Sequence, residues 1–181
     1  VKRGVCQEVV HADDADLSAL PVLKCWPLDG EPEKFAETAR GVRIAEILAG
    51  AGAQDPRGEF TPTSGMAPGR YITLGAVFTK HPETGERNVG MYRVQLLGPR
   101  RAAMHWHLHH DGARHFRAYA GRGERMPVAI ALGGPAILPY AATCPLPPGV
   151  DECLFAGFLQ GRALELCPGI TQPQLEVPTT A

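Results

Sequence analysis

Apolar side chains in the first part of the chain show one clear helical pattern. In the stretch EPEKFAETARGVRIAEILAG they recur every three or four residues, so they line one face of a helix. We therefore predict a helix over about residues 32–49, ended by Gly50. The next stretch, AGAQDPRGEFTPTSGMAPG, is dense in Gly, Pro, Ser and Thr, which predicts a mobile loop.

Strand-like and helix-like stretches alternate in the rest of the chain. RYITLGAVFTK, VGMYRVQLL and AAMHWHL predict an antiparallel meander, MPVAIALGG a buried strand, and ALELC and QLEVP a strand pair. Short helices are predicted from DGARHFRAYAGRG, ended by Gly121 or Gly123, from PAILPYAATCP, with proline at its first position, and from GVDECLFAGFLQG. Strands with helices inserted between them predict one α+β domain over residues 1–181, with a small barrel or folded sheet as its core.

Composition narrows the class of protein. The chain has 181 residues, of which 44% are hydrophobic, and a formal net charge of -1, so no general attraction to nucleic acid or anionic lipid is expected. It has no apolar run long enough for a membrane span and no signal-peptide pattern, so a cytoplasmic location is expected. Five cysteines without a CxxC pair argue against a disulfide framework and a zinc knuckle, and they predict mostly buried, reduced thiols at Cys6, Cys25, Cys144, Cys153 and Cys167.

Four histidines stand within MHWHLHHDG. On a regular strand, His105, His107 and His109 would share one face and could gather around a cation, because imidazole is a common metal ligand. The alternative is that most of them are surface or core-edge groups satisfied by hydrogen bonds. A hard divalent ion would also need oxygen ligands, for which Asn88 and Glu152 are candidates.

Two further motifs leave alternatives open. In NVGMYR, regular alternation would place Asn88, Gly90 and Tyr92 on one face, while Arg93 could bind a carboxylate through two parallel hydrogen bonds or form a surface ion pair. Prolines in TCPLPPGVDE stiffen the backbone before Glu152 and could fix where its carboxylate points. Alternatively, Asp151 and Glu152 only begin a helix and interact with its dipole. The ALGGPA turn could bind an anion at a helix start or merely connect a strand to a helix.

Six ordered blocks resemble the central part of the UbiD family of reversible decarboxylases: DLSALPVLKCWPLDG, HPETGERNVGMYR, MHWHLHHDGA, MPVAIALGGPA, PLPPGVDECLFAGFL and LEVPTTA. The resemblance covers the chain except residues 31 to about 68. It implies a split β-barrel related to flavin reductases, which binds prenylated FMN through its phosphate. A divalent ion, commonly manganese, and a monovalent ion such as potassium accompany the flavin.

The resemblance also implies roles for single residues. The metal ligands of the family fall on Asn88, His109 and Glu152, so the other three histidines of the segment become supporting or surface groups. The catalytic arginine falls on Arg93, which is expected to hold the substrate carboxylate over the modified flavin ring. Backbone groups near four further residues are expected to line the phosphate and monovalent-ion site: Gly90, Met91, Thr143 and Cys144.

The implied reaction is loss of CO2 from an aromatic or α,β-unsaturated acid, with covalent catalysis by the flavin. The implied partners are a flavin prenyltransferase that supplies the cofactor and, for a full-length member, further copies in a homo-oligomer. Family members continue past the VP strand into a segment with glutamates that supply a proton, so the chain is expected to be a piece truncated at both ends. Residues 31–68 are an insertion of unassigned role.

Three functions therefore stay open. The first is the core of a UbiD-like carboxy-lyase. The second is a flavin-binding module without decarboxylase activity, because a general acid is worth roughly 10²–10⁴-fold in rate and the acidic segment is not in the sequence. The third is a cupin-like metal enzyme that would use the HxHxH pattern together with a distant glutamate.

Overall fold

The computed structural model describes residues 2–20 and 71–181. The helix predicted at 32–49 and the loop after it lie outside the described residues. Spatial contacts between residues divide the chain into two compact units. One contains residues 1–15, 72–94 and 103–181, and the other contains residues 16–71 and 95–102.

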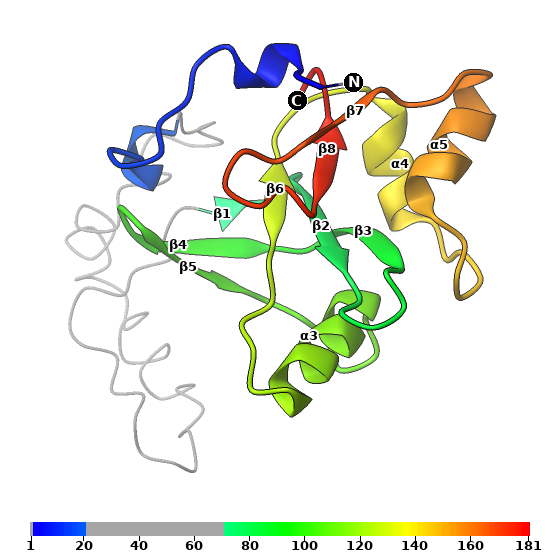
Figure 1. The fold of residues 1–181 in the computed structure, drawn as a ribbon, viewed down its shortest axis with the longest axis horizontal. Helices are drawn as coiled ribbons and strands as arrows, with labels where there is room; N and C mark the ends of the chain where they lie inside the picture. Colours follow the sequence, from blue (N-terminus) through cyan, green and yellow to red (C-terminus); the bar gives the residue numbers. More distant parts are fainter. Residues whose placement is uncertain (1, 21–70) are drawn as a thin grey trace, which may run out of the picture. The chain divides into compact units, whose positions relative to one another are not determined.

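The first unit holds most of the regular structure. Its elements are, in chain order, η1 (Val5–Gln7), β2 (Ala76–Lys80), β3 (Arg87–Met91), α3 (Asp111–Gly121), β6 (Ala129–Ala131), α4 (Ile137–Thr143), α5 (Glu152–Gln160), β7 (Leu166–Pro168) and β8 (Glu176–Pro178). Short strands and helices follow one another along this unit (Figure 1), which confirms the predicted mixture of α and β structure.

The remaining elements lie wholly or partly in the second unit. They are η2 (Leu17–Ala19), β1 (Tyr71–Ile72), β4 (Val94–Gly98) and β5 (Arg101–Met104). The three strands form one sheet in the order β1-β4-β5. The backbone N–H of Leu17 donates to the carbonyl of Pro99 at 2.7 Å, next to the tight turn between β4 and β5.

Strand β2 is the centre of a second sheet, with the order β3-β2-β6. It is antiparallel to both neighbours, and its register with β3 pairs Phe78 with Val89 and Thr79 with Asn88. Because successive residues of a strand point to opposite faces, Phe78 and Val89 lie on one face of this sheet and Thr79 and Asn88 lie on the other.

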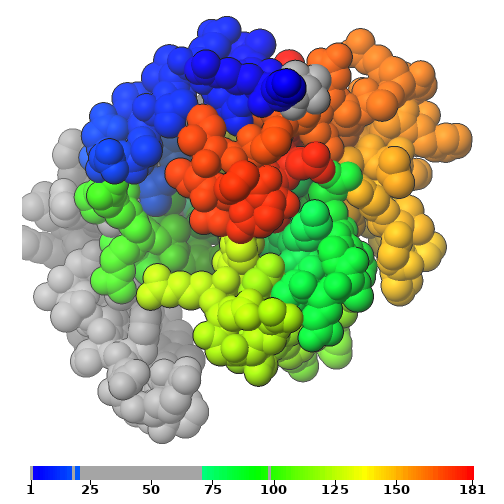
Figure 2. Space-filling model, in the orientation of Figure 1, coloured from blue at the N-terminus to red at the C-terminus, as the bar shows by residue number. Residues whose placement is uncertain are grey.

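The face that carries Phe78 is the apolar core. It is built from Ala76, Phe78, Val89 and Ala131 of the sheet, Leu138 of α4 and Cys153 of α5. Helices α4 and α5 contact β3 on this side, and the β7-β8 pair contacts β6 through β8. The N-terminal residues lie against the C-terminal strands (Figure 2), where the N–H of Cys6 donates to the carbonyl of Thr179 at 3.0 Å.

The opposite face of the sheet is buried but polar, and α3 contacts it through β2 and β3. Thr79, Asn88 and His115 are all buried there, at 0%, 5% and 0% exposure, beside the buried Tyr92. We call Thr79, Asn88, Tyr92 and His115 the polar layer under α3. Burial of polar groups is costly unless they are hydrogen-bonded, so this layer needs internal partners.

Several predicted elements are confirmed. Helix α3 ends at Gly121, α5 begins directly after its N-cap Asp151, and β7 pairs antiparallel with β8. The proline prediction for α4 was wrong, because Pro135 precedes the N-cap Ala136 instead of occupying the first helical position.

The lengths of the predicted strands were wrong. RYITLGAVFTK is interrupted between β1 and β2, VGMYRVQLL is broken at Tyr92 and Arg93 into β3 and β4, and the strand in AAMHWHL stops at Met104. MPVAIALGG gives only the three residues of β6. Within the described residues the strands form three small sheets and no closed barrel, and no described helix has the length and apolarity needed to cross a lipid bilayer.

Candidate functional site

The buried residue Asn88 of β3 is tied to α3 through Tyr92. The side-chain N–H of Asn88 donates to the hydroxyl oxygen of Tyr92 at 3.2 Å, and the backbone N–H of Gly112 donates to the same oxygen at 3.3 Å. Burial raises the pKa of the Tyr92 phenol, which keeps the hydroxyl neutral. One oxygen therefore joins the sheet to the first turn of α3.

Two glycines make room for the Tyr92 ring. A Cβ on Gly90 would lie 2.4 Å from Cζ of Tyr92, and a Cβ on Gly112 would lie 3.0 Å from Nε1 of Trp106 and 3.1 Å from Cε2 of Tyr92. The rings of Tyr92 and Trp106 meet edge to face, with centroids 6.1 Å apart. The absence of side chains at these two positions thus lets the Tyr92 ring lie between β3 and α3.

Glu152 contacts the same strand, β3, from helix α5. It is the first residue of α5, and its Oε2 accepts a hydrogen bond from the backbone N–H of Val89 at 2.9 Å. Since β3 is an edge strand and alternate residues of an antiparallel pair direct their N–H groups away from the partner, this N–H is free to bind a side chain. Burial raises the pKa of Glu152, an effect that a nearby cation would oppose.

Asp151, the residue before Glu152, is the N-cap of α5. Its Oδ1 accepts from the N–H of Cys153 at 2.7 Å, while its Oδ2 accepts from Nη2 of Arg87 at 2.6 Å. Arg87 also donates to Glu176 at 3.1 Å. Asp151 therefore joins the start of α5 to the side chain of Arg87 at the beginning of β3, while Glu152 binds the backbone of the same strand.

The strand predicted through the histidine segment was wrong, so His105, His107 and His109 do not share a strand face. Strand β5 ends at Met104, and the N–H of His110 donates to the carbonyl of His107 at 3.0 Å in a turn before α3. All four histidines are exposed, and the ring of His107 lies 5.4 Å from that of His109 and 5.6 Å from that of His110. In the described part of the chain, no three or more His, Cys, Asp or Glu side chains form a group that could hold a metal ion, which argues against a cupin-like site.

Two of the three predicted ligands are attached to neighbouring points of β3. Asn88 belongs to this strand, and Glu152 binds the backbone N–H of the next residue, Val89. His109 is exposed and lies three residues before Gly112, whose N–H is bound to Tyr92. The inclusion of His109 as a third ligand stays a prediction.

The other predicted site residues surround the end of β3 or the end of α4. Arg93 is an exposed residue between β3 and β4, and its carbonyl accepts from the N–H of His105 at 3.0 Å. Thr143 and Cys144 end α4, and their side chains donate to the carbonyl of Tyr140 at 2.8 and 3.3 Å. Helix α4 contacts β3, which carries Gly90 and Met91. The roles of these four residues in phosphate or monovalent-ion binding remain predictions.

The ALGGPA turn is a connection between β6 and α4. Gly133 and Gly134 have φ values of 83° and 89°, which favour glycine. Helix α4 has only seven residues, so the anion alternative gains no support.

Sequence reasoning missed the role of Tyr92 and did not mention His115. The ring Nδ1 of His115 lies 3.0 Å from Oγ1 of Thr79, and its Nε2 is buried without a hydrogen-bond partner among the described residues. Burial lowers the pKa of His115 to about 4. For Tyr92, the only signal in the sequence was the predicted alternation that placed it on the same face as Asn88.

A cleft of about 300 Å³ lies beside the turn between β2 and β3. Charged groups line it, among them Lys80, Glu86, Arg87, Asp151 and Glu176, and none of the predicted site residues does. Because Arg87 already pairs with Asp151 and Glu176, most of this charge is internally neutralised.

Comparison with known proteins decides the family. The family model UbiD, described as "3-octaprenyl-4-hydroxybenzoate carboxy-lyase Rift-related domain", matches residues 62–181. The chain belongs to the UbiD family. The match contains Asn88, Tyr92, Arg93, His109 and Glu152.

Two relatives extend the similarity to the rest of the chain. An uncharacterized protein of Aquifex aeolicus (strain VF5) is 42% identical over 181 residues, which is 100% of this chain and 29% of that protein. An uncharacterized protein of Archaeoglobus fulgidus is 37% identical over 166 residues, 91% of this chain and 26% of that protein. The chain thus spans less than a third of either relative, and the Aquifex alignment runs through residues 31–68.

Solved UbiD-class enzymes share the fold. HmfF from Pelotomaculum thermopropionicum in complex with FMN is 33% identical with a TM-score of 0.58, over 63% of this chain and 25% of that chain. An evolved dimeric form of HmfF in complex with prFMN is 33% identical with a TM-score of 0.57, over 62% of this chain and 26% of that chain. Vanillic acid decarboxylase of Sedimentibacter hydroxybenzoicus, in closed form, is 27% identical with a TM-score of 0.59, over 61% of this chain and 24% of that chain.

Proposed function

We propose that the chain is the cofactor-binding core of a UbiD-type carboxy-lyase that removes CO2 from an aromatic or α,β-unsaturated acid. One observation carries this proposal: Oε2 of Glu152 accepts a hydrogen bond from the backbone N–H of Val89, the residue that follows Asn88. The solved relatives that contain FMN or prFMN support it. A split β-barrel architecture, a cytoplasmic location, a prenyltransferase that supplies the flavin and a homo-oligomeric full-length protein belong to the same proposal.

The proposed ligands suit a divalent ion such as Mn²⁺. Asn88 and Glu152 offer oxygen donors and His109 offers an imidazole, a set that hard and borderline divalent ions accept. Glu152 is partly buried, and burial raises its pKa, so a bound cation would favour its charged form. A monovalent ion such as K⁺ would bind near Gly90, Met91, Thr143 and Cys144.

Arg93 is the residue proposed to hold the substrate. Its guanidinium can bind a carboxylate through two parallel hydrogen bonds, and its exposure between β3 and β4 leaves it accessible to a small acid. Prenylated FMN, when bound, supplies the electron sink that decarboxylation requires. The residues of the chain supply orientation: Asn88, His109 and Glu152 fix the ion, and Arg93 fixes the acid.

Loss of the Glu152 charge is expected to remove most of the bound cofactor. After co-expression with a flavin prenyltransferase, Glu152→Gln and His109→Ala should each retain no more than about a tenth of the Mn²⁺ and flavin that the wild type retains. Mutation of residues that only hydrogen-bond to a metal ligand already lowers metal affinity by about tenfold or more. Metal analysis and the UV-visible spectrum measure both. His105→Ala, an exposed histidine of the same segment, is the matched control and should keep both ligands. Equal metal and flavin in the wild type, Glu152→Gln and His109→Ala would refute the ligand assignment.

A second candidate is flavin binding by these 181 residues without decarboxylation. Release of CO2 from a panel of aromatic and cinnamic-type acids separates the two candidates. Turnover by the purified chain would exclude the second one, and flavin binding without turnover would support it.

A further inference from the structure

We propose that Tyr92 is a positioning residue for the ion site, an inference that rests on the proposed function. Its hydroxyl oxygen accepts the side-chain N–H of Asn88 at 3.2 Å and the backbone N–H of Gly112 at 3.3 Å. The amide of Asn88 is planar, so a fixed N–H fixes the direction of its oxygen as well. Tyr92 thereby presets the oxygen that would meet the cation.

The hydroxyl does more than packing requires. The Tyr92 ring fills the space over Gly90 and meets the edge of Trp106, and a phenylalanine ring would fill that space equally well. Only the hydroxyl provides an acceptor for two N–H groups in a region where Tyr92 is 7% exposed and Asn88 is 5% exposed. Buried donors without an acceptor are destabilising, so without this oxygen the Asn88 amide is expected to turn toward another partner.

The same hydroxyl also orders the segment that carries the third proposed ligand. Gly112, which donates to Tyr92, lies three residues after His109 and belongs to the first turn of α3. The ring of His110 lies 5.2 Å from the Tyr92 ring. Tyr92 therefore connects the amide of β3 with the histidine segment, whose residues are about 20 positions later in the sequence.

Substitution of Tyr92 by phenylalanine tests this role through metal affinity. In the presence of saturating FMN, the dissociation constant for Mn²⁺, measured by the EPR signal of the free ion, is expected to rise 10- to 100-fold, the usual effect of losing a residue that orients a metal ligand. The thermal midpoint should change by only a few degrees. Tyr140→Phe, which removes the hydroxyl of a tyrosine that is 60% exposed, should leave the dissociation constant unchanged.

A double-mutant cycle separates positioning from a general structural effect. If Tyr92 acts through Asn88, then Tyr92→Phe should weaken Mn²⁺ binding in the wild type but have no further effect in Asn88→Ala. Wild-type affinity in Tyr92→Phe, or equal effects in both backgrounds, would overturn this inference while the proposed function stands. Absence of Mn²⁺ and FMN binding by the wild type would overturn the proposed function itself.

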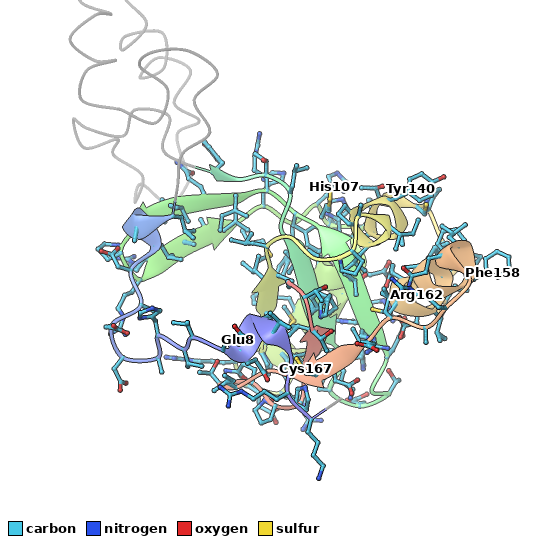
Figure 3. The ribbon with its side chains drawn as sticks, turned by 90° about the horizontal axis from the view of Figure 1, so that it is seen from above. Glu8, His107, Tyr140, Phe158, Arg162 and Cys167 are labelled. Carbon is cyan, nitrogen blue, oxygen red and sulfur yellow. The ribbon has the colours of Figure 1, made fainter. Side chains whose placement is uncertain are left out.

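Independently, two thiols far from this site are close to each other. Sγ of Cys6 lies 3.8 Å from Sγ of Cys167, although the two residues are 161 positions apart. Further contacts hold η1 against the C-terminal strands: the Cys6 N–H donates to Thr179 at 3.0 Å, and the Gln7 side chain donates to the carbonyl of Pro168 at 2.6 Å. Figure 3 shows Glu8, at the end of η1, beside Cys167 of β7.

We infer that Cys6 and Cys167 form a disulfide when the protein meets a low-molecular-weight disulfide. Both are free thiols in this structure, and a bond of about 2.05 Å requires the sulfur atoms to approach by less than 2 Å from their separation of 3.8 Å. Residues 2–7 precede the first strand and have only the three-residue helix η1, so a small shift of Cys6 disturbs little regular structure.

The exchange proceeds in two balanced steps. The partly exposed Cys6 attacks, as thiolate, one sulfur of a small disulfide RSSR, which gives a mixed disulfide and one RS⁻. The buried Cys167 transfers its proton to RS⁻, and its thiolate attacks the Cys6 sulfur and expels the second RS⁻, which takes the proton that Cys6 released. The protein loses two hydrogen atoms and RSSR becomes two RSH. Burial raises the pKa of the Cys167 thiol, so the second step is expected to be the slower one.

Thiol counting and peptide mapping test the pair. Treatment with oxidised glutathione should lower the thiols titrated in denaturant from five to three, and a non-reduced digest should contain a Cys6–Cys167 cross-linked peptide. Cys144→Ser, which removes the other partly exposed described thiol, should still give that peptide, whereas Cys6→Ser and Cys167→Ser should not. Five remaining thiols, a lasting glutathione adduct on Cys6, or a cross-link to a different cysteine would each overturn this inference.

Discussion

Replacement of Phe78 by alanine is expected to lower the free energy of unfolding by about 3–5 kcal/mol. Phe78 is fully buried in the central strand β2, where it pairs with Val89 and belongs to the core with Leu138 and Cys153. Its removal leaves a cavity that helices α4 and α5 border. Small domains have a total stability of only about 5–15 kcal/mol, so urea denaturation should show a large shift of the midpoint.

Phe158 provides the matched control for this substitution. It is a phenylalanine of α5 that is 80% exposed, so Phe158→Ala should change the free energy of unfolding by less than about 0.5 kcal/mol. Similar losses for both variants would contradict the placement of the core on this face of the sheet. Because Phe78 pairs with Val89, the neighbour of Asn88, flavin binding should weaken together with stability.

Stability is also expected to fall as the pH decreases from about 6.5 to about 4, because of His115. The folded protein protonates this buried histidine only near a pKa of about 4, whereas the ordinary pKa is 6.5. Between these values the unfolded chain binds more protons than the folded one, so the free energy of unfolding decreases as the pH falls. The loss approaches about 3 kcal/mol at pH 4, at roughly 1.4 kcal/mol for each pH unit, and vanishes above pH 6.5.

Urea denaturation at several pH values between 7.5 and 4 measures this effect. Arg114, Glu86 and His81 all influence the charge of His115, so the comparison of variants isolates its share. His115→Gln should flatten the pH dependence in this window, while His11→Gln, at an exposed histidine, should retain it. An identical pH dependence in wild type and His115→Gln would show that another group is responsible.

The fold elements that sequence patterns predicted well are helices with clear local end signals. Helix α3 ends at Gly121, and α5 begins after Asp151, a favourable N-cap residue, and ends before Gly161. Strand ends were predicted poorly, because they depend on distant partners. The strand after Met91 breaks at Tyr92, whose ring contacts Gly90 and is hydrogen-bonded to Gly112, and no local pattern reports those contacts.

The candidate site was predicted in part. Asn88 and Glu152 were assigned by resemblance, but the hydrogen bond that joins Glu152 to Val89 depends on how α5 packs against β3. The histidine segment has the two-residue spacing of a strand, yet it forms a turn before α3, because tertiary packing overrides local preference. Likewise, an odd number of cysteines gave no sign that two of them lie 3.8 Å apart.

The hydrogen bond between Glu152 and Val89 has a further consequence for solubility. Edge strands present unpaired N–H groups on which an extended segment of another molecule can dock and start ordered aggregation. On β3, a docking strand would have to displace the carboxylate of Glu152, which already accepts the hydrogen bond of the Val89 N–H, and would leave that partly buried carboxylate without this partner. Glu152, which is proposed to bind the ion, thus also opposes the pairing of strands from other molecules with β3.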